Sequence, residues 1–233
     1  NSADEALAGY AKRISVKVAS DGLIEVSDNG RGIPVEIHPE EGRPAVELVF
    51  CKLHAGGKFN KKDAGNAYRF SGGLHGVGVS VTNALSTRLE VEIRRGGGIH
   101  HIAFGAGFVS EPLTRIGDCG QRNTGTTVRI RPDPRYFDSP KVNLAQLEHL
   151  LRSKAVLMPN VTVDLEIEGE TPKSWCYRNG MADYLAEMMV GQPVAPIFVA
   201  EKYVDTANGF ASLSRGFGKP KWVDPLRSEV KLW

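Results

Sequence analysis

Hydrophobic and polar positions alternate along the chain with two periods, one typical of strands and one typical of helices. Residues 14–19 and 23–28 alternate with a period of two on either side of Gly22, which predicts two paired strands joined by a turn. The same alternation predicts further strands at residues 88–95, 99–104, 126–131 and 161–167. Helical spacing of apolar residues predicts helices at the start of the chain and at residues 44–54, 77–85, 143–158 and 180–189. Strands with helices on one side predict the α/β class, as a two-layer α/β sandwich.

Two stretches of the chain lack a clean period. Residues 55–78 are rich in glycine and lysine, and a loop of this length inside a compact domain is usually functional or mobile. After about residue 201 the pattern weakens, and residues 205–221 are rich in Gly, Ser, Lys and Asn. We therefore expect one domain over residues 1–200, followed at 201–233 by either a tail or the start of a second domain.

Composition and charge narrow the class of protein. The 233 residues are 41% hydrophobic and 24% charged, which is ordinary for a soluble globular protein. The net charge of +2 is too small to indicate a surface that binds nucleic acid. A local basic patch, or DNA contacts made by another part of a longer protein, remain alternatives. Three widely spaced cysteines without CxxC pairing argue against a disulfide framework or a zinc site, and favour a reducing, cytoplasmic location.

No apolar run reaches the length of a membrane span, so we expect no membrane contact. The chain begins with Asn1 inside a predicted helix, so we expect a fragment of a longer protein.

Two motifs could surround a polar ligand group. Asp-Asn-Gly-Arg-Gly-Ile-Pro at residues 28–34 ends a predicted strand, where Asp28 could accept a hydrogen bond from a ligand's amino group. For this motif alone, a plain turn with Asp28 and Asn29 as turn residues is an equally weighted alternative. Asn-Thr-Gly-Thr-Thr at residues 123–127 could place Thr126 near Asp28 to hold a ligand or an ordered water. Taken alone, it would be an ordinary strand-entry turn.

A glycine-rich run, Ser-Gly-Gly-Leu-His-Gly-Val-Gly at residues 71–78, leads into a predicted helix. Its backbone N–H groups and the helix start suit a polyphosphate. It is neither a P-loop nor a Rossmann fingerprint, because GxxxxGK[ST] and a strand-linked GxGxxG are both missing. A flexible linker is the alternative, but the apolar residues from Val77 to Leu85 favour a packed helix.

Two further positions carry groups that suit a metal-bound phosphate. Lys58, in the glycine-rich stretch, could reach a phosphate as a point charge, whereas alone it would be a solvated lysine. Asn1, with Asp4 and Glu5, offers the oxygen ligands that Mg²⁺ takes. The alternative for these three residues is an ordinary polar helix face.

Together and in this order, the motifs resemble the GHKL ATPases, which include gyrase-type topoisomerases, MutL mismatch-repair proteins, heat-shock chaperones and histidine kinases. Longer matches narrow the resemblance to the B subunits of bacterial type II DNA topoisomerases. They are Asn-Ser-Ala-Asp-Glu-Ala-Leu-Ala-Gly at 1–9, Ile-His-Pro-Glu-Glu-Gly at 37–42, Leu-His-Ala-Gly-Gly-Lys-Phe at 53–59 and Phe-Ser-Gly-Gly-Leu-His-Gly-Val-Gly at 70–78. Residues 119–126, 137–140 and 154–157 are more similar to topoisomerase IV than to gyrase, and the resemblance covers about residues 1–190.

The resemblance implies a Bergerat (GHKL) fold that holds ATP and Mg²⁺ under a glycine-rich lid. Asn1 matches the Mg²⁺-binding asparagine, Asp28 matches the aspartate that binds the adenine amino group, and Thr126 matches the threonine that shares its ordered water. Glu5 and Arg31 match an ion pair over the mouth of the pocket. The other matched positions line the adenine pocket or the lid, namely Gly32, Ile33, Pro34, Lys58, Tyr68, Gly73, Leu74, His75, Gly76, Val77 and Gly78. Apolar walls of the pocket are expected at Val26, Val49 and Val128.

The resemblance also implies a role in a longer protein. ATP would drive dimerisation of two B subunits, and an A subunit would cleave DNA, so that the complex passes DNA strands and unlinks or relaxes circles. The general-base glutamate of the family lies four residues before the metal-binding asparagine, which is Asn1 here, so no catalytic residue is assigned in this sequence. The N-terminal dimer arm and the lysine of a downstream transducer domain are missing too. Because phosphoryl transfer needs a poised nucleophile, we expect this chain to bind nucleotide better than it hydrolyses it. Two alternatives stay open: another GHKL ATPase of the MutL or kinase type, and a non-enzymatic fragment.

Overall fold

The computed structural model describes residues 1–53, 77–139 and 141–189, together with two short strands near the C-terminus. The chain divides into two compact units, Asn1–Met188 and Met189–Trp233. In the second unit, β9 (Phe210–Ala211) and β10 (Trp222–Val223) form an antiparallel pair. The predicted boundary near residue 200 stays a prediction, and the site described below belongs to the first unit.

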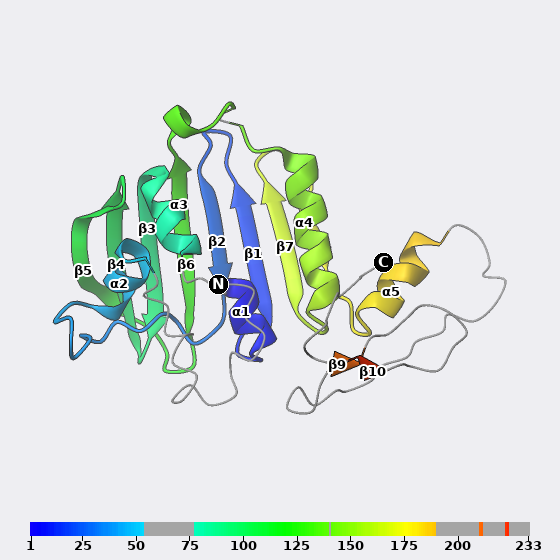
Figure 1. The fold of residues 1–233 in the computed structure, drawn as a ribbon, viewed down its shortest axis with the longest axis horizontal. Coiled ribbons are helices and arrows are strands. Elements are labelled where there is room, and N and C mark those ends of the chain that lie inside the picture. Colours follow the sequence, from blue (N-terminus) through cyan, green and yellow to red (C-terminus); the bar gives the residue numbers. More distant parts are fainter. Residues whose placement is uncertain (54–76, 140, 190–209, 212–221, 224–233) are drawn as a thin grey trace. The chain divides into compact units, whose positions relative to one another are not determined.

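The first unit is built on one mixed eight-stranded sheet with the order β5-β4-β3-β6-β2-β1-β7-β8 (Figure 1). Its strands are β1 (Arg13–Val18), β2 (Ile24–Asp28), β3 (Ser86–Arg95), β4 (Gly98–Gly105), β5 (Phe108–Asp118), β6 (Gly125–Pro132), β7 (Thr162–Ile167) and β8 (Lys173–Trp175). Strands β1 and β7 are parallel, and the other neighbouring pairs in this sheet are antiparallel. The sheet therefore brings β2 and β6, which are about 100 residues apart in sequence, side by side at its centre.

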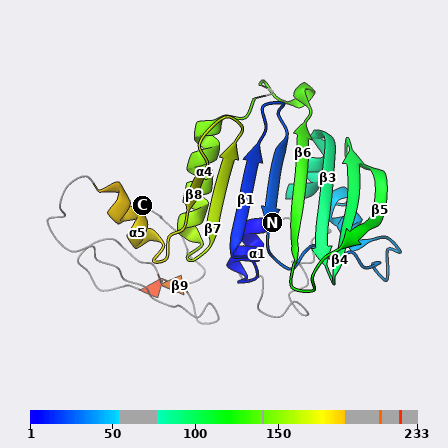
Figure 2. The ribbon, with the colours of Figure 1, turned by 180° about the vertical axis from the view of Figure 1, so that it is seen from behind.

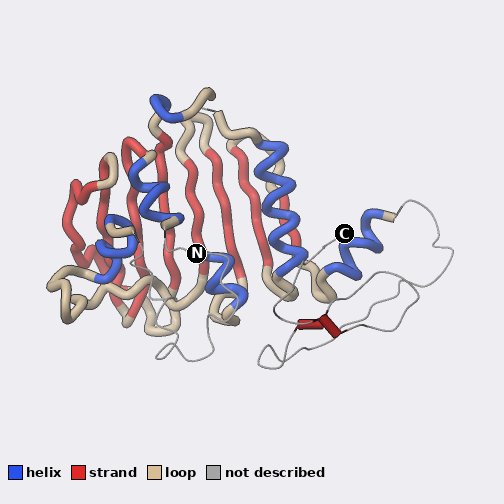
Figure 3. The backbone as a smooth tube through the Cα atoms, in the orientation of Figure 1, coloured by secondary structure: helices blue, strands red, loops and turns tan. Residues whose placement is uncertain are grey.

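Helices cover one face of this sheet (Figures 1 and 3), and the view from behind shows the strands in front of them (Figure 2). The helices of the first unit are α1 (Ser2–Leu7), α2 (Ala45–Cys51), α3 (Gly78–Ala84), α4 (Leu144–Leu157) and α5 (Met181–Met188), with a short 3₁₀ turn at Pro134–Tyr136. Helix α4 begins where the Asn143 side chain accepts a hydrogen bond from the N–H of Gln146, as expected for an N-cap. The two-layer α/β sandwich predicted from the sequence is confirmed.

The two faces of the sheet differ in chemistry because successive side chains of a strand point to opposite faces. One helix-facing row crosses six strands in register and is wholly apolar: Ile102, Val91, Val128, Val26, Val16 and Leu165. The neighbouring row on the other face alternates in charge: Glu90, Arg129, Glu25, Lys17 and Glu166. Ion pairs connect it, with 2.7 Å between Arg129 Nε and Glu25 Oε2 and 3.0 Å between Lys17 Nζ and Glu166 Oε2.

Predicted and observed elements agree where the apolar period is regular. The predicted strands and helices are present, with ends that differ by a few residues. Strands β5 and β8 were not predicted. Strand β5 is an edge strand with register shifts, and most of its side chains are exposed, so it lacks a clean alternation. Strand β8 has only three residues.

Candidate functional site

Two buried polar residues interrupt the apolar, helix-facing side of the sheet. Asp28, at the end of β2, lies opposite Ile14, and Thr126, near the start of β6, lies opposite Ile93. The two residues retain only 7% and 6% of their accessible surface. Because burying a polar group is costly unless it has partners, this pair marks the place where the core face becomes a site.

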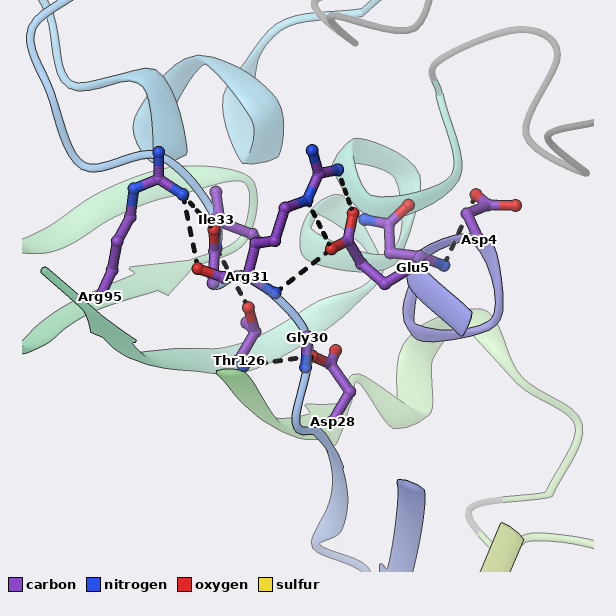
Figure 4. Close-up of polar contacts among 10 residues, drawn as sticks. Asp4, Glu5, Asp28, Gly30, Arg31, Ile33, Arg95 and Thr126 are labelled. Atoms are coloured by element: carbon purple, nitrogen blue, oxygen red, sulfur yellow. Dashed lines mark hydrogen bonds and ion pairs between the residues drawn. The ribbon is translucent and has the colours of Figure 1, made fainter. Parts of the chain in front are cut away.

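Three hydrogen bonds fix the carboxylate of Asp28, and Figure 4 shows the two that involve Gly30 and Thr126. Its Oδ1 accepts from the backbone N–H of Gly30 at 2.9 Å and from that of Thr126 at 3.4 Å. Its Oδ2 accepts from the hydroxyl of Ser2 at 2.8 Å. A carboxylate offers about four acceptor positions, so a carboxylate held in this way can still accept from a ligand.

Further hydrogen bonds hold the backbone of the loop that follows Asp28. The N–H of Ile33 donates to the hydroxyl oxygen of Thr126 at 3.2 Å, which ties the loop to β6. Arg95 donates from Nη1 to the carbonyl oxygens of Gly32 at 3.1 Å and Arg31 at 3.4 Å (Figure 4). The loop therefore presents a fixed backbone beside Asp28 and Thr126.

The guanidinium of Arg95 is itself held by Glu36. Its Nε lies 3.2 Å from Glu36 Oε1. A hydrogen bond from its own backbone, and then the Arg95 guanidinium, lower the pKa of the Glu36 carboxyl below its ordinary value. The loop is thus connected through Arg95 to the segment that leads into α2.

Glu5 and Arg31 form a forked ion pair beside this loop (Figure 4). Arg31 Nη2 lies 2.8 Å from Glu5 Oε1, and Arg31 Nε donates to Glu5 Oε2 at 3.1 Å. The backbone N–H of Arg31 also donates to Glu5 Oε2, at 3.3 Å. A bidentate contact of this kind fixes the orientation of the guanidinium relative to the carboxylate as well as the distance between them. Helix α1 is thereby joined to the Asp28–Pro34 loop.

The structure brings together half of the predicted site residues. Contacts connect α1, the loop after β2 and the start of β6, where Asn1, Glu5, Asp28, Arg31, Gly32, Ile33, Pro34 and Thr126 lie. Val77 and Gly78 lie at the start of α3, where Val77 is the N-cap residue. The other predicted residues, Lys58, Tyr68, Gly73, Leu74, His75 and Gly76, lie outside the described residues.

The three expected apolar wall residues lie on the helix-covered side of the sheet. Val26 and Val128 are directly opposite each other on β2 and β6. Val26 packs against the two apolar clusters around β1, β7 and α4, and Val128 packs against the cluster of β3, β4 and α2. Val49, on α2, packs against the second cluster. The polar pair therefore lies where the two halves of the core meet.

Comparison with known proteins decides the family. Residues 1–136 match the family described as histidine kinase-, DNA gyrase B- and HSP90-like ATPases. The chain belongs to this ATPase family. The resemblance stated from the motifs is thus confirmed, and the Bergerat-type fold is confirmed with it.

Within this ATPase family, the chain is similar to subunits of type II topoisomerases. It is 54% identical over 197 residues to the B subunit of DNA topoisomerase 4 from Escherichia coli, covering 84% of this chain and 31% of that protein. The topoisomerase IV ATP-binding domain of Francisella tularensis, solved with a small-molecule inhibitor, has a TM-score of 0.73 and 41% identity, covering 88% of this chain and 53% of that one. The 43K ATPase domain of Thermus thermophilus gyrase B, solved with an aminocoumarin, has a TM-score of 0.70 and 36% identity, covering 81% and 46%. The chain spans about a third of the length of the curated relatives it matches.

Two further observations concern metal ligands and membrane spans. In the part of the chain that the structure describes, no three or more His, Cys, Asp or Glu side chains are grouped to hold a metal ion. None of the described helices is long and apolar enough to cross a membrane.

Sequence reasoning missed several residues that shape the site. Ser2 and Arg95 contact the Asp28 carboxylate and the loop backbone, respectively. Gly125 is needed because its φ is 150° and a Cβ there would collide with the carbonyl oxygen of Asp28. A signal for Gly125 existed, since the glycine stands inside the Asn-Thr-Gly-Thr-Thr motif. Nothing in the sequence pattern pointed to Ser2 or Arg95, because their contacts depend on how α1 and β3 lie beside β2 and β6.

Proposed function

We propose that the chain binds ATP at the Asp28–Thr126 site, with Asp28 accepting a hydrogen bond from the adenine amino group. The observation that carries the proposal is a buried carboxylate, fixed by three donors, on the sheet face where the central strands β1, β2 and β6 are mainly apolar. Thr126 is proposed to share a water with Asp28, and Val26, Val128 and Ile33 are proposed to supply apolar surface for a base. A few fixed polar groups among apolar walls are what a small-molecule site needs to orient its ligand.

The proposal extends to the phosphates and to Mg²⁺. Mg²⁺ is usually held by one or two protein oxygens together with phosphates and waters, so it does not require a cage of carboxylates. Asn1, immediately before α1, is proposed to give one oxygen through its side chain. When bound, the ion would neutralise charge on the phosphates. Glu5 and Arg31 are proposed to cover the pocket mouth, and the proposed lid comprises Lys58, Tyr68, Gly73, Leu74, His75, Gly76, Val77 and Gly78.

In the longer protein, this domain is proposed to act as the ATPase in the B subunit of a cytoplasmic type II DNA topoisomerase, of the topoisomerase IV kind. The proposed partners are a second B subunit, which would dimerise on ATP binding, an A subunit and, through the intact complex, DNA. The ATP-binding domain is proposed to occupy residues 1–200, with residues 201–233 as a tail or the start of a transducer domain. The long similarity to the B subunit of DNA topoisomerase 4 supports this assignment over a MutL-like ATPase.

The test is calorimetric titration of the chain with a non-hydrolysable ATP analogue and Mg²⁺, beside the matching GTP analogue. Asp28→Asn should weaken binding of the ATP analogue by about 1.5–3 kcal/mol, the loss expected for a hydrogen bond to a charged group. Asp133→Asn is the matched control, because Asp133 is also buried, at 2% exposure, but follows the opposite end of β6. It should leave the affinity unchanged.

Equal affinities of the parent chain and Asp28→Asn would remove the adenine assignment. Equal affinities for the ATP and GTP analogues would mean that the site recognises the phosphates and does not distinguish the bases. A cooperative melting transition whose midpoint temperature rises with the ATP analogue would exclude the non-enzymatic, partly folded alternative, because a ligand that binds only the folded state stabilises it.

A further inference from the structure

The ring of Tyr10 lies against the guanidinium of Arg31. The distance from Arg31 Cζ to the ring centroid is 3.6 Å. Elsewhere among the described residues, the corresponding distances are 5.2 Å for Arg152 over Tyr184 and 5.7 Å for Arg135 over Tyr136. At the shorter distance the planar guanidinium is in van der Waals contact with the ring, and cation–π attraction adds to this packing.

The end of helix α1 fixes Tyr10 in this place. Gly9 has a φ of 85° and its N–H donates to the carbonyl oxygen of Ala6 at 2.9 Å. The N–H of Tyr10 reaches back to the carbonyl oxygen of Glu5, also at 2.9 Å. This pair of hydrogen bonds around a left-handed glycine is the Schellman motif, which defines where the next residue leaves the helix. The position of Tyr10 is therefore set by the helix and not by a flexible loop.

One residue, Glu5, organises both contacts to Arg31. Its carbonyl oxygen accepts from the backbone N–H of Tyr10, and its carboxylate accepts two hydrogen bonds from the guanidinium. The carboxylate thus contacts the edge of the guanidinium while the tyrosine ring contacts its face. Together they hold the Arg31 guanidinium by its edge and by one face.

Arg31 stands between two glycines, Gly30 and Gly32, and its ion pair with Glu5 is partly open to solvent. Its own side chain is 39% exposed, and Glu5 is 20% exposed. An ion pair at such exposure contributes little by itself, because solvent screens it and two long side chains lose rotamer freedom. Stacking on a ring held by the helix end removes part of that freedom in advance.

We propose that Tyr10 is a positioning residue, whose ring holds the Arg31 guanidinium across the mouth of the nucleotide site and so slows release of the nucleotide. The inference rests on the proposed function, because the mouth matters only if a nucleotide binds behind it. Tyr10 acts through Arg31 and needs no contact with the nucleotide. Its effect should therefore fall on the dissociation rate, since a mouth that opens more often releases its ligand sooner.

The test measures dissociation of a fluorescent, non-hydrolysable ATP analogue from the chain by stopped-flow displacement. Tyr10→Leu should speed dissociation about three- to tenfold, the range that corresponds to one cation–π contact of this kind. Tyr10→Phe keeps the aromatic face and should stay within about twofold of the parent rate. Tyr136→Leu removes a more loosely packed tyrosine–arginine pair far along the sequence and should leave the rate unchanged.

A double-mutant cycle separates positioning from a general effect on folding. In the Arg31→Leu background, Tyr10→Leu should have no further effect on dissociation, because there is no guanidinium left to hold. An undiminished effect in that background, or a Tyr10→Phe rate as fast as that of Tyr10→Leu, would overturn the inference. So would a Tyr10→Leu rate equal to that of the parent when the parent binds the analogue. If the parent chain itself fails to bind, the proposed function fails and the inference falls with it.

Discussion

At the scale of single residues, the site depends on glycines at which the backbone approaches a neighbouring strand. Gly32 has a φ of 75°, and a Cβ there would lie 2.6 Å from the carbonyl oxygen of Arg94 on β3. The sequence motif indicated that glycine permits an unusual path here. The close approach to β3 explains why no other residue fits.

Substituting Gly32 by alanine should therefore cost more than the left-handed conformation alone. Gly42 is the matched control, since it has a φ of 63° but a Cβ there would meet no atom within 4 Å beyond its chain neighbours. Gly42→Ala should lose about 1–2 kcal/mol of unfolding free energy, the cost of left-handed backbone for a residue with a Cβ. Gly32→Ala should lose more than Gly42→Ala and should also weaken nucleotide binding, because the loop beside Asp28 must shift. Urea unfolding of both variants measures the loss of unfolding free energy, and calorimetric titration measures the loss of nucleotide affinity. Equal losses of unfolding free energy in the two variants would mean that the loop moves away from β3 without cost.

The residues of the site differ in how far the sequence revealed them. Asp28 and Thr126 were predicted to lie near each other although they are 98 positions apart, and the structure confirms this contact. The motifs and the resemblance carried that prediction. Ser2, Arg95 and Tyr10 were not predicted, because their roles arise from the docking of α1 and the register of β3. Local pattern does not encode either of these.

At the scale of elements, a polar cluster joins α5 to α4. The hydroxyl of Tyr177 donates to Glu187 Oε2 at 2.8 Å and accepts from Arg152 Nε at 3.0 Å. Arg152 Nη2 lies 3.0 Å from Glu187 Oε1, and the Tyr177 and Tyr184 rings meet edge to face at 5.9 Å. No residue of α5 is fully buried, so these contacts, more than apolar burial, hold the helix in place.

Acid should weaken this cluster in a defined direction. The hydrogen bond from Tyr177, and then Arg152, lower the pKa of Glu187 below its ordinary value of 4.5. A carboxyl whose pKa is lowered in the folded state stabilises the fold above its unfolded pKa, and this stabilisation is lost as pH falls through the folded pKa. The melting temperature of Glu187→Gln should therefore lie below that of the parent at pH 7, and the two should converge as pH falls below about 4.5. Parallel melting curves from pH 7 to pH 3 would mean that Glu187 does not contribute through its charge.

Elements were predictable where burial is one-sided and regular. The strands β1, β2, β3, β6 and β7 alternate between the apolar helix-facing side and the charged side, which is the pattern that sequence reasoning detects. Helix α4 shows its packed side through Leu147 and Leu151, which contact the core. Strand β5 escaped prediction because most of its side chains are exposed and register shifts interrupt its pairing.

At the scale of the whole first unit, the sheet separates an apolar face from a charged one, and the site opens within the apolar face. Two core clusters lie around β1, β7 and α4, and a third lies around β3, β4 and α2. Asp28 and Thr126 stand between them, so a base bound as proposed would contact residues from both halves of the core.

The asymmetry of the two faces can be tested at neighbouring positions of β7. Leu165 points to the helices and is 1% exposed, whereas Glu166 points to the other face and pairs with Lys17 at 3.0 Å, with both side chains about half exposed. Leu165→Ala should lower the free energy of unfolding by about 2–5 kcal/mol, because it removes buried methyl groups and leaves a cavity. Glu166→Gln should lower it by less than about 1 kcal/mol, since solvent already screens the pair. Urea unfolding followed by circular dichroism compares the two, with an unchanged denaturant slope as the sign that only stability has changed. If Glu166→Gln costs as much as Leu165→Ala, the charged face must be covered by a further layer of protein, and the two-layer description of this unit would be wrong.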